Sequence, residues 1–220
     1  MKNMAMDQSL LSKEHIHRLC AGMGFHFSDT VTEGLSIYLS LLTRWNRVMN
    51  LVGKARPEDI LHVLIADSFY LAKFLDDLPL PESPEIWDLG SGAGLPGIPL
   101  RLLRQQGQYT LVEARDKRAG FLQTVLAACP LQGTAVFRGR VEVFMPTRPK
   151  ANMTISRAFM PWEQVLRLVA PFISSGGLCV FLMRKPAPTA LPKEWSLFLQ
   201  QKYSTAGQER YFWALRLRAC

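Results

Sequence analysis

The segment "WDLGSGAGLPGIPL", from Trp87 to Leu100, constrains the fold more than any other part of the chain. It places four glycines and two prolines directly after a short apolar run and ahead of another apolar segment. Ligands of open α/β sheets bind beyond the carboxyl ends of strands, where glycines let the backbone approach a ligand and a helix start offers free N–H groups. Pro96 and Pro99 are compatible with that helix, because its first turn has no intrahelical N–H partners to lose. The segment predicts a strand, a loop that receives a nucleotide-like ligand, and a helix; the alternative is a tight turn without a ligand.

Downstream of this segment, short β-like runs alternate with helical ones. Helices are expected near Pro96, over Lys117 to Ala128 and over Pro161 to Ala170. The alternation predicts an α/β fold with a mainly parallel sheet. The five expected strands are Ile86 to Leu89, Tyr109 to Glu113, Ala135 to Arg138, Met153 to Ser156 and Leu178 to Met183.

The two ends of the chain have different patterns. Apolar residues recur at helical spacing from Leu35 to Met49 and again from Ile60 to Leu75, and Pro57 is suited to open the second helix. The proline-rich "DDLPLPESPE" then reads as a linker, so we expect a small N-terminal helical part at 1–78 and a second domain at 79–220. Near the C-terminus, "QQKYSTAGQERYFWALRLR" predicts an antiparallel strand pair turning at Ala206 and Gly207.

Composition narrows the partners and the compartment. The 220 residues include 26 Lys and Arg against 18 Asp and Glu, a formal charge of +8 that favours RNA or DNA over membrane surfaces, with solubility alone as the plain alternative. The four cysteines form no C-x-x-C pair, which predicts neither a disulfide framework nor a zinc site. The apolar runs are too short to span a membrane. We therefore expect a cytoplasmic protein without a metal, and a monomer is the simplest oligomeric state.

The glycine loop fits two ligand classes. Gly92, Gly94 and Gly97 satisfy G-x-G-x-x-G, and Glu113 lies about 20 residues on, as expected for a carboxylate that binds a ribose in a dinucleotide site. Asp88, two residues before Gly90, would oppose a pyrophosphate but could receive the ammonium of a methionine moiety. S-adenosylmethionine has that ammonium and no phosphate. Asp88 and Glu113 could also have purely structural roles, as a turn cap and a solvated strand end.

Several further motifs occur in a fixed order with the glycine loop: "RWNRVMNL" (Arg44 to Leu51), "ADS" (Ala66 to Ser68), "DKRAGFL" (Asp116 to Leu122), "GRVEVF" (Gly139 to Phe144) and "ISRAF" (Ile155 to Phe159). With "DLGSGAGLPGIPL", this set resembles the bacterial small-subunit ribosomal RNA guanine-N7 methyltransferase G family, also called the glucose-inhibited division protein B family. The resemblance extends from about Leu35 to near the C-terminus.

The resemblance implies a Rossmann-like class I methyltransferase fold, S-adenosyl-L-methionine as donor, and a guanine in the decoding-region loop of 16S ribosomal RNA, within the small ribosomal subunit, as acceptor. It places Glu113 at the donor ribose, Val141 and Glu142 at the adenine, and Arg157 near the acceptor guanine or the methionyl end. Arg140, Lys117 and Arg118 would face RNA or hold the loop. The methionyl side of the donor would be lined by residues of the glycine loop: Asp88, Gly90, Ser91, Gly92, Gly94 and Leu95.

The chain departs from the family pattern at two positions. Leu64 stands where the family usually has a His three residues ahead of the Asp-Ser pair, and Met183 stands where it usually has a Lys after the fifth strand, with Arg184 and Lys185 following. A neighbouring cation can replace that Lys as a phosphate contact. A different RNA acceptor, a noncatalytic RNA-binding protein and a nicotinamide-dependent oxidoreductase are the competing readings.

The expected chemistry needs few catalytic groups. Methyl transfer from a sulfonium is an in-line displacement, and guanine N7 has a free lone pair, so orientation can supply much of the acceleration without a general base. Arg157 would repel charge developing at N7, and we expect it to orient O6 or a phosphate instead. Trp45 is expected in the core, whereas Trp87 and Trp162 could each stack on a purine. Candidate phosphate contacts are Arg44, Arg47, Lys54, Arg56, Arg184 and Lys185.

Overall fold

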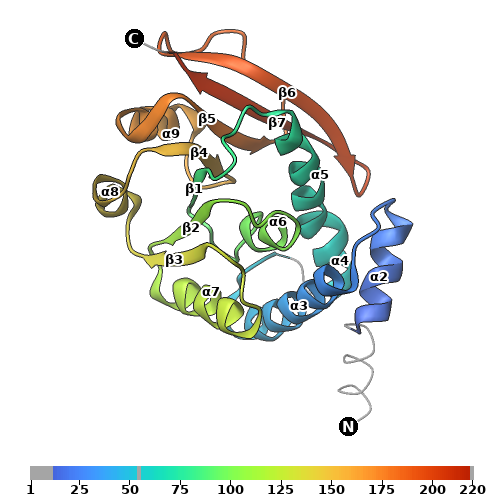
Figure 1. The fold of residues 1–220 in the computed structure, drawn as a ribbon. Coiled ribbons are helices and arrows are strands. Elements are labelled where there is room, and N and C mark those ends of the chain that lie inside the picture. The colour runs from blue at the N-terminus through green and yellow to red at the C-terminus, as the bar shows by residue number, and fades with distance from the viewer. Residues whose placement is uncertain (1–11, 54–55, 219–220) are drawn as a thin grey trace.

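The computed structural model describes residues 12–53 and 56–218, which fold around one seven-stranded sheet (Figure 1). The strand order is β3-β2-β1-β4-β5-β7-β6, with the first five strands parallel and β7 antiparallel to both of its neighbours. The strands are β1 Glu85–Leu89, β2 Gln108–Glu113, β3 Thr134–Arg138, β4 Ala151–Ser156, β5 Ile173–Met183, β6 Trp195–Thr205 and β7 Gln208–Leu217.

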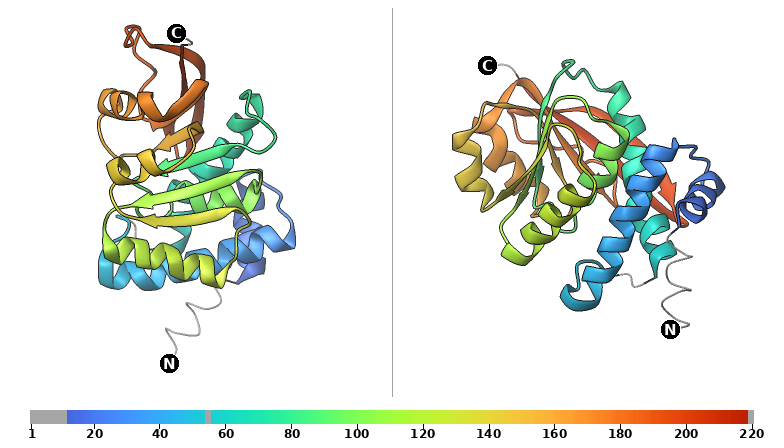
Figure 2. Two further views of the ribbon diagram at one scale, coloured as in Figure 1. Left: turned by 60° about the vertical axis from the view of Figure 1, so that its left-hand side comes forward. Right: turned by 60° about the horizontal axis from the view of Figure 1, so that its bottom comes forward.

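Helices cover both faces of the sheet, as the views in Figure 2 show. On one face lie α2 Lys13–Gly22, α3 Asp29–Met49, α4 Pro57–Ile60, α5 Ala66–Phe74, α6 Gly97–Leu103 and α7 Asp116–Ala128, and on the other lie α8 Val141–Phe144 and α9 Trp162–Val169. A π-helical turn, Leu61–Ile65, joins α4 to α5. Single 3₁₀ turns occupy Leu75–Asp77, Met145–Thr147 and Ala170–Phe172.

Successive residues of the central strands enter opposite cores, which is why their sequences are almost continuously apolar. On β1, Ile86 packs under the α3 and α5 side, whereas Trp87 packs under α8 and α9. Trp87 is fully buried, lies edge-on to Phe144, and donates its indole N–H to Glu85 at 2.8 Å. The prediction that Trp87 could stack on a purine is therefore wrong, because no face of its ring reaches the surface.

The predicted strands and helices are confirmed, with differences at their ends. The helix expected from Leu35 begins six residues earlier, at Asp29, where the Ser28 hydroxyl accepts a hydrogen bond from Val31 N–H. Helix α2 was not predicted; it is short and has only two buried residues, Ile16 and Cys20. The expected linker is shorter than its proline pattern indicates, because its first residues finish a 3₁₀ turn and its last begins β1.

The C-terminal hairpin forms as predicted. Thr205 pairs with Gln208 around a two-residue turn in which Ala206 and Gly207 both have positive φ, 49° and 72°. This geometry matches the right-handed twist of the two strands. The hairpin extends the sheet sideways beyond β5, and its strand β6 lies beside α5 (Figure 1), so this side of the sheet packs against the N-terminal helices.

Candidate active site

The glycine loop begins at the carboxyl end of β1 and is held by its own backbone and by β2. Gly90 N–H and Ser91 N–H donate to Val112 O, Gly92 N–H donates to the Glu113 carboxylate at 2.9 Å, and Gly94 N–H donates to Ser91 O. Gly90 has a φ of 69° and approaches the Phe159 ring so closely that a Cβ would overlap it. A side chain at this position is excluded by both the backbone conformation and the neighbouring ring.

Two further side chains, one on α3 and one near the end of β1, also contact the loop or the helix that follows it. Tyr38 on α3 donates its hydroxyl to Ala93 O at 2.7 Å. Asp88 is 1% exposed and lies under the start of α6, where it accepts from the Tyr109 hydroxyl at 3.2 Å and from Gly97 N–H. Burial, only partly offset by these donors, raises the pKa of Asp88 to about 7. The hydrogen bonds from Tyr109 and Gly97 connect Asp88 to β2 and to the start of α6.

A cavity of about 340 Å³ opens beside this loop, at the carboxyl ends of β1 to β4. Glu113 ends β2 inside it, 5% exposed, with its two carboxylate oxygens accepting from Gly92 N–H and Arg115 N–H. Each oxygen keeps a free lone pair, so the carboxylate can accept two further hydrogen bonds. Other lining residues come from the segments that follow β1, β2, β3 and β4, including the first turns of α7 and α8: Gly90, Arg118, Arg140, Val141, Glu142, Ala158, Phe159 and Met160.

The structure brings some of the sequence-predicted site residues together and separates others. Gly90, Glu113, Val141 and Glu142 line one cavity, although the first and the last of them lie 52 residues apart in the chain. Behind that cavity wall, in the loop and beneath it, are Asp88, Ser91, Gly92, Gly94 and Leu95. Arg157 does not line the cavity; its side chain points toward α5 on the other side of β4. The ligand roles assigned to all these residues remain predictions.

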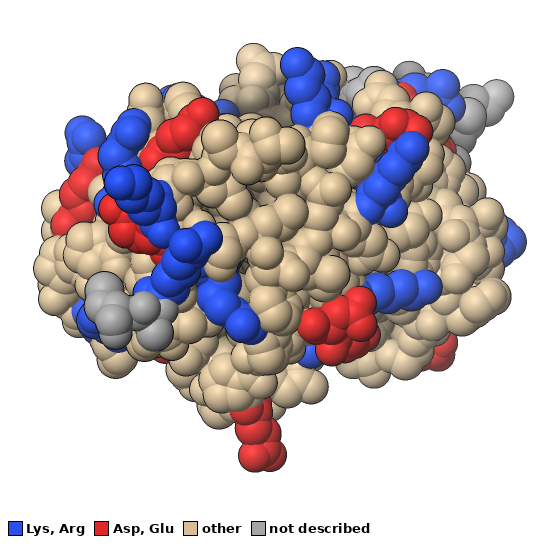
Figure 3. Space-filling model, turned by 90° about the horizontal axis from the view of Figure 1, so that it is seen from above, with Lys and Arg blue, Asp and Glu red and all other residues tan. Residues whose placement is uncertain are grey.

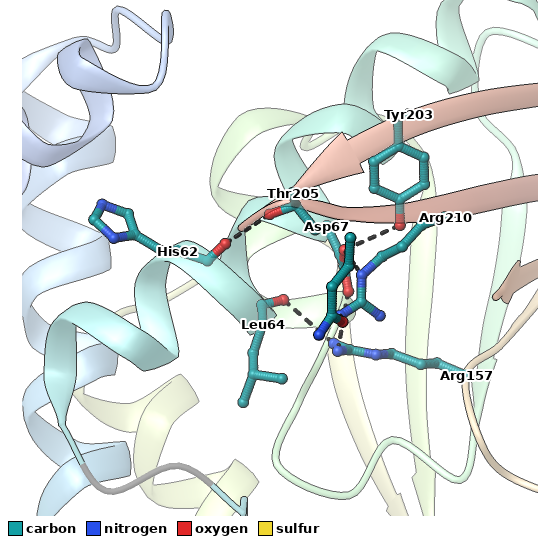
Figure 4. Close-up of polar contacts among 8 residues, drawn as sticks. His62, Leu64, Asp67, Arg157, Tyr203, Thr205 and Arg210 are labelled. Carbon is teal, nitrogen blue, oxygen red and sulfur yellow. Dashed lines mark hydrogen bonds and ion pairs between the residues drawn. The ribbon is translucent and has the colours of Figure 1, made fainter.

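Arg157 belongs to a buried polar cluster centred on Asp67 (Figure 4). Asp67, on α5, is 1% exposed and pairs with Arg157 at 3.0 Å and with Arg210 at 3.5 Å. It also accepts a hydrogen bond from the Tyr203 hydroxyl at 3.0 Å. Burial raises the pKa of Asp67, whereas the two guanidinium groups and the phenol favour its charged form. The second guanidinium nitrogen of Arg157 donates to Leu64 O at 3.3 Å.

Four separate elements meet in this cluster: α5, the end of β4, and both strands of the C-terminal hairpin (Figure 4). Sequence reasoning quoted Asp67 within the motif "ADS" but missed its partners Tyr203 and Arg210. The sequence contained one indication of the cluster, which is the carboxylate of Asp67 inside an otherwise apolar helix. A buried carboxylate is stable only with a partner, so a cation elsewhere in the fold was to be expected. Nothing in the spacing indicated which cation.

The two departures from the family pattern have different surroundings. Leu64 packs its half-buried side chain on the apolar core and offers only its carbonyl to Arg157. The neighbouring His62 offers its carbonyl to Thr205 on the hairpin at 2.6 Å. Met183, at the end of β5, lines a second cavity together with Arg184 and Lys185. The contact between residue 64 and Arg157 therefore does not depend on the side chain at position 64.

The predicted phosphate contacts are exposed where they are described. Arg44, Arg56, Arg184 and Lys185 lie at the surface, and Trp45 packs edge-on against Phe121 as expected. Lys54 and Cys220 lie outside the described residues. On the face seen in Figure 3, basic side chains gather at one side among acidic ones, and a broad uncharged middle separates them from other cations.

The fold is the Rossmann-like fold of methyltransferases. Among solved structures, an O-methyltransferase from Bacillus cereus in complex with SAH has a TM-score of 0.59 at 12% identity, covering 82% of this chain and 90% of that one. MtNAS in complex with MTA and tNA has a TM-score of 0.60 at 11% identity, covering 94% of this chain and 76% of that one. At these identities the likeness concerns the fold alone.

Sequence comparison identifies the family. The family model described as rRNA small subunit methyltransferase G matches residues 31–203. Ribosomal RNA small subunit methyltransferase G of Nitratidesulfovibrio vulgaris is 51% identical over 206 residues, 94% of each chain, and that of Oleidesulfovibrio alaskensis is 43% identical over 222 residues, 96% of this chain and 97% of the relative. The chain belongs to the rRNA small subunit methyltransferase G family.

Across residues 12–53 and 56–218, no helix combines the length and the apolar character needed to cross a membrane. In the same ranges, no group of three or more His, Cys, Asp or Glu side chains is arranged to hold a metal ion.

Proposed function

We propose that this protein transfers a methyl group from S-adenosyl-L-methionine to N7 of a guanine in the decoding-region loop of 16S ribosomal RNA. The observation that carries the donor assignment is the 340 Å³ cavity at the carboxyl ends of four parallel strands, with a buried carboxylate, Glu113, in its wall. Glu113 would accept from the ribose hydroxyls, and Val141 and Glu142 would flank the adenine. The donor supplies an electrophilic methyl group on a sulfonium.

The hydrogen bonds of the glycine loop favour this donor over a dinucleotide. A pyrophosphate needs free N–H groups at the loop and at the helix start. Here Gly92 N–H is taken by Glu113, Gly94 N–H by Ser91 O, and Gly97 N–H by Asp88. A ligand without phosphate does not need these N–H groups.

Family membership and charge support the RNA acceptor. The curated relatives are named as ribosomal RNA methyltransferases, and the net charge of +8 suits a polyanion. Guanine N7 is nucleophilic without deprotonation, so a site without a general base is sufficient. The reaction then depends on holding the methyl group and N7 in line, and positioning is the main contribution of the protein.

Arg157 is the candidate for orienting the acceptor. Two of its nitrogens are held by Asp67 and Leu64 O, its side chain is 17% exposed, and a guanidinium has five N–H donors. The remaining donors can bind guanine O6 or a phosphate oxygen, away from the positive charge that develops at N7. The Arg157→Ala variant is expected to lose most of its turnover while still binding the donor. Full turnover of this variant on the correct RNA would contradict the orienting role of Arg157.

The direct experiment is transfer of labelled methyl from S-adenosylmethionine to small ribosomal subunits that lack the modification, followed by mapping of the labelled nucleotide. Label at N7 of the decoding-loop guanine is the expected result. Label at another nucleotide would contradict the proposed acceptor and would still support methyl transfer from this donor. Donor binding without transfer to subunits or naked RNA would favour the noncatalytic alternative.

Donor binding has its own test in Glu113→Gln. Loss of the charged acceptor removes about 1.5–3 kcal/mol per hydrogen bond, so the Kd for S-adenosylhomocysteine is expected to rise by at least about tenfold in calorimetry. Asp116→Asn is the matched control, because Asp116 is also a carboxylate just after β2 but pairs with Arg138 at the surface. Equal Kd values for the two variants would contradict the assignment of Glu113.

A further inference from the structure

A second cavity, of about 580 Å³, lies next to the donor cavity at the same edge of the sheet. It is open to solvent and lies between the loop from β4 to α9 and the segment that follows β5. Its walls are mainly apolar and aromatic, with Met160, Trp162, Phe181, Met183 and Trp213 among the lining side chains. None of the residues given a role in the proposed function lines this second cavity.

The two cavities share a wall. Ala158 and Met160, directly after β4, line both of them. Ala158 has a φ of 51°, a left-handed conformation that is uncommon for a residue with a Cβ and that turns the chain sharply at the end of the strand. A ligand in the second cavity therefore lies one loop away from a donor in the first, which is the arrangement that a two-substrate transfer requires.

Trp162 is the aromatic side chain best placed to contact a ligand. It is the first residue of α9 and half-buried, and it meets Trp213 edge-on at a centroid distance of 6.1 Å. Trp213 is 2% exposed, and its indole N–H donates to Lys185 O at 3.0 Å, which fixes the start of the segment after β5. Trp213 therefore has a structural role in the cavity wall, and Trp162 is the tryptophan whose ring a ligand can reach.

Two cations stand at the rim. Arg184 and Lys185 line the cavity and are exposed, and within the described residues neither side chain forms an ion pair. An apolar, aromatic interior with unpaired cations at its mouth is complementary to a nucleotide, whose base has a π-face and whose phosphates are anionic. It is poorly matched to a peptide or a lipid chain, because neither combines a flat ring with adjacent phosphates.

The chemistry of the acceptor adds a geometric demand. The major groove of an RNA helix, where guanine N7 lies, is too deep and narrow for side chains to reach, so proteins recognise RNA bases in single-stranded loops whose bases are unstacked. Enzymes that modify a base move it into a pocket. We propose, resting on the function proposed above, that this cavity receives the acceptor guanine of single-stranded RNA, stacked on Trp162, with Arg184 and Lys185 contacting the flanking phosphates. Arg157 does not line this cavity, so in this arrangement it contacts a phosphate oxygen and not guanine O6.

The test compares Trp162→Ala and Trp162→Phe in the methyl-transfer assay. Stacking of one base on an aromatic ring is worth about 1–3 kcal/mol, so Trp162→Ala is expected to lower kcat/KM for RNA by about 5- to 150-fold. Trp162→Phe keeps an aromatic face and is expected to retain most activity. In both variants the Kd for S-adenosylhomocysteine should match wild type. Trp45→Ala, which removes another half-buried tryptophan outside both cavities, should leave kcat/KM for RNA unchanged.

The phosphate contacts proposed for Arg184 and Lys185 are tested by the salt dependence of RNA binding. The double variant Arg184→Ala, Lys185→Ala is expected to weaken RNA binding and to reduce the slope of log Kd against log salt by about one to two. Arg167→Ala removes an exposed cation from α9 outside the cavity and should leave the slope unchanged. RNA binding is measured with a short guanine-containing oligoribonucleotide in the presence of S-adenosylhomocysteine.

The outcomes separate this inference from the proposed function. Transfer to the decoding-loop guanine with unaltered kcat/KM in Trp162→Ala overturns the cavity assignment alone. Binding of the oligoribonucleotide that depends on Trp162, without transfer to guanine N7, overturns the proposed reaction and keeps the cavity as an RNA site. Loss of S-adenosylhomocysteine binding in Trp162→Ala would show that the residue serves the donor or the fold, and would also overturn the inference.

Discussion

Removing a single hydroxyl, in Tyr203→Phe, tests whether the Asp67 cluster stabilises the junction between the N-terminal helices and the C-terminal hairpin. The phenol donates to the buried Asp67 carboxylate at 3.0 Å, and the ring stacks on Phe212 at a centroid distance of 4.2 Å. Phenylalanine keeps the ring and its packing, and it loses only the donor. The change therefore isolates one hydrogen bond to a charged group.

The expected magnitude follows from what remains around Asp67. A hydrogen bond to a charged group contributes about 1.5–3 kcal/mol. Asp67 keeps its pairs with Arg157 and Arg210, so the carboxylate is not left without a partner, and the lower end of the range applies. For a chain of this size, about 1.5–2 kcal/mol corresponds to a fall in Tm of roughly 3–8 °C.

Thermal unfolding followed by circular dichroism measures this difference. Tyr70→Phe is the matched control: Tyr70 packs against Tyr203 at 5.1 Å, and its hydroxyl makes no hydrogen bond within the described residues. Its Tm should stay within about 1 °C of wild type. If the two variants had the same Tm, the phenol of Tyr203 would contribute nothing through Asp67, and the reasoning on the cluster would be refuted.

Two further predictions concern the turn after β1. The pKa of Asp88 is about 7 in the folded protein and near 4 when unfolded, so only the folded state holds this proton between those pH values, and stability should fall by up to about 4 kcal/mol as pH rises through them. Urea unfolding of Asp88→Asn should lack this part of the pH dependence; identical profiles would contradict it. Gly97→Ala places a Cβ against Asp88, Leu111 and Tyr109 and should cost about 1–3 kcal/mol. Gly120→Ala, with nothing within 4 Å of its Cβ, should instead gain up to about 1 kcal/mol, and a loss in both variants would refute the steric argument.

Local sequence was sufficient for the elements and their class. Strands buried on both faces are recognisable as short apolar runs, and their alternation with helical segments indicates a parallel sheet. The turn at Ala206 and Gly207 is also local, because a two-residue hairpin depends on the conformations of its own residues. Helix α2 was not predicted, because only Ile16 and Cys20 are buried and its sequence therefore shows almost no helical period of apolar residues.

The assembly of the site was decided by tertiary structure. Trp87 and Trp162 cannot be told apart as sequence letters, yet one is sealed in a core and the other lines a cavity. Trp87 lies on the central strand β1, covered by α8 and α9, whereas Trp162 begins α9 at the edge of a cavity. Asp67, Arg157 and Arg210 lie up to 143 residues apart and meet only when α5, β4 and the hairpin pack together. The sequence by itself determined the glycine loop, because backbone conformation and close approach are local demands on residue type. Which charges pair, and which ring remains accessible, depends on contacts between distant segments, and these exist only in the packed fold.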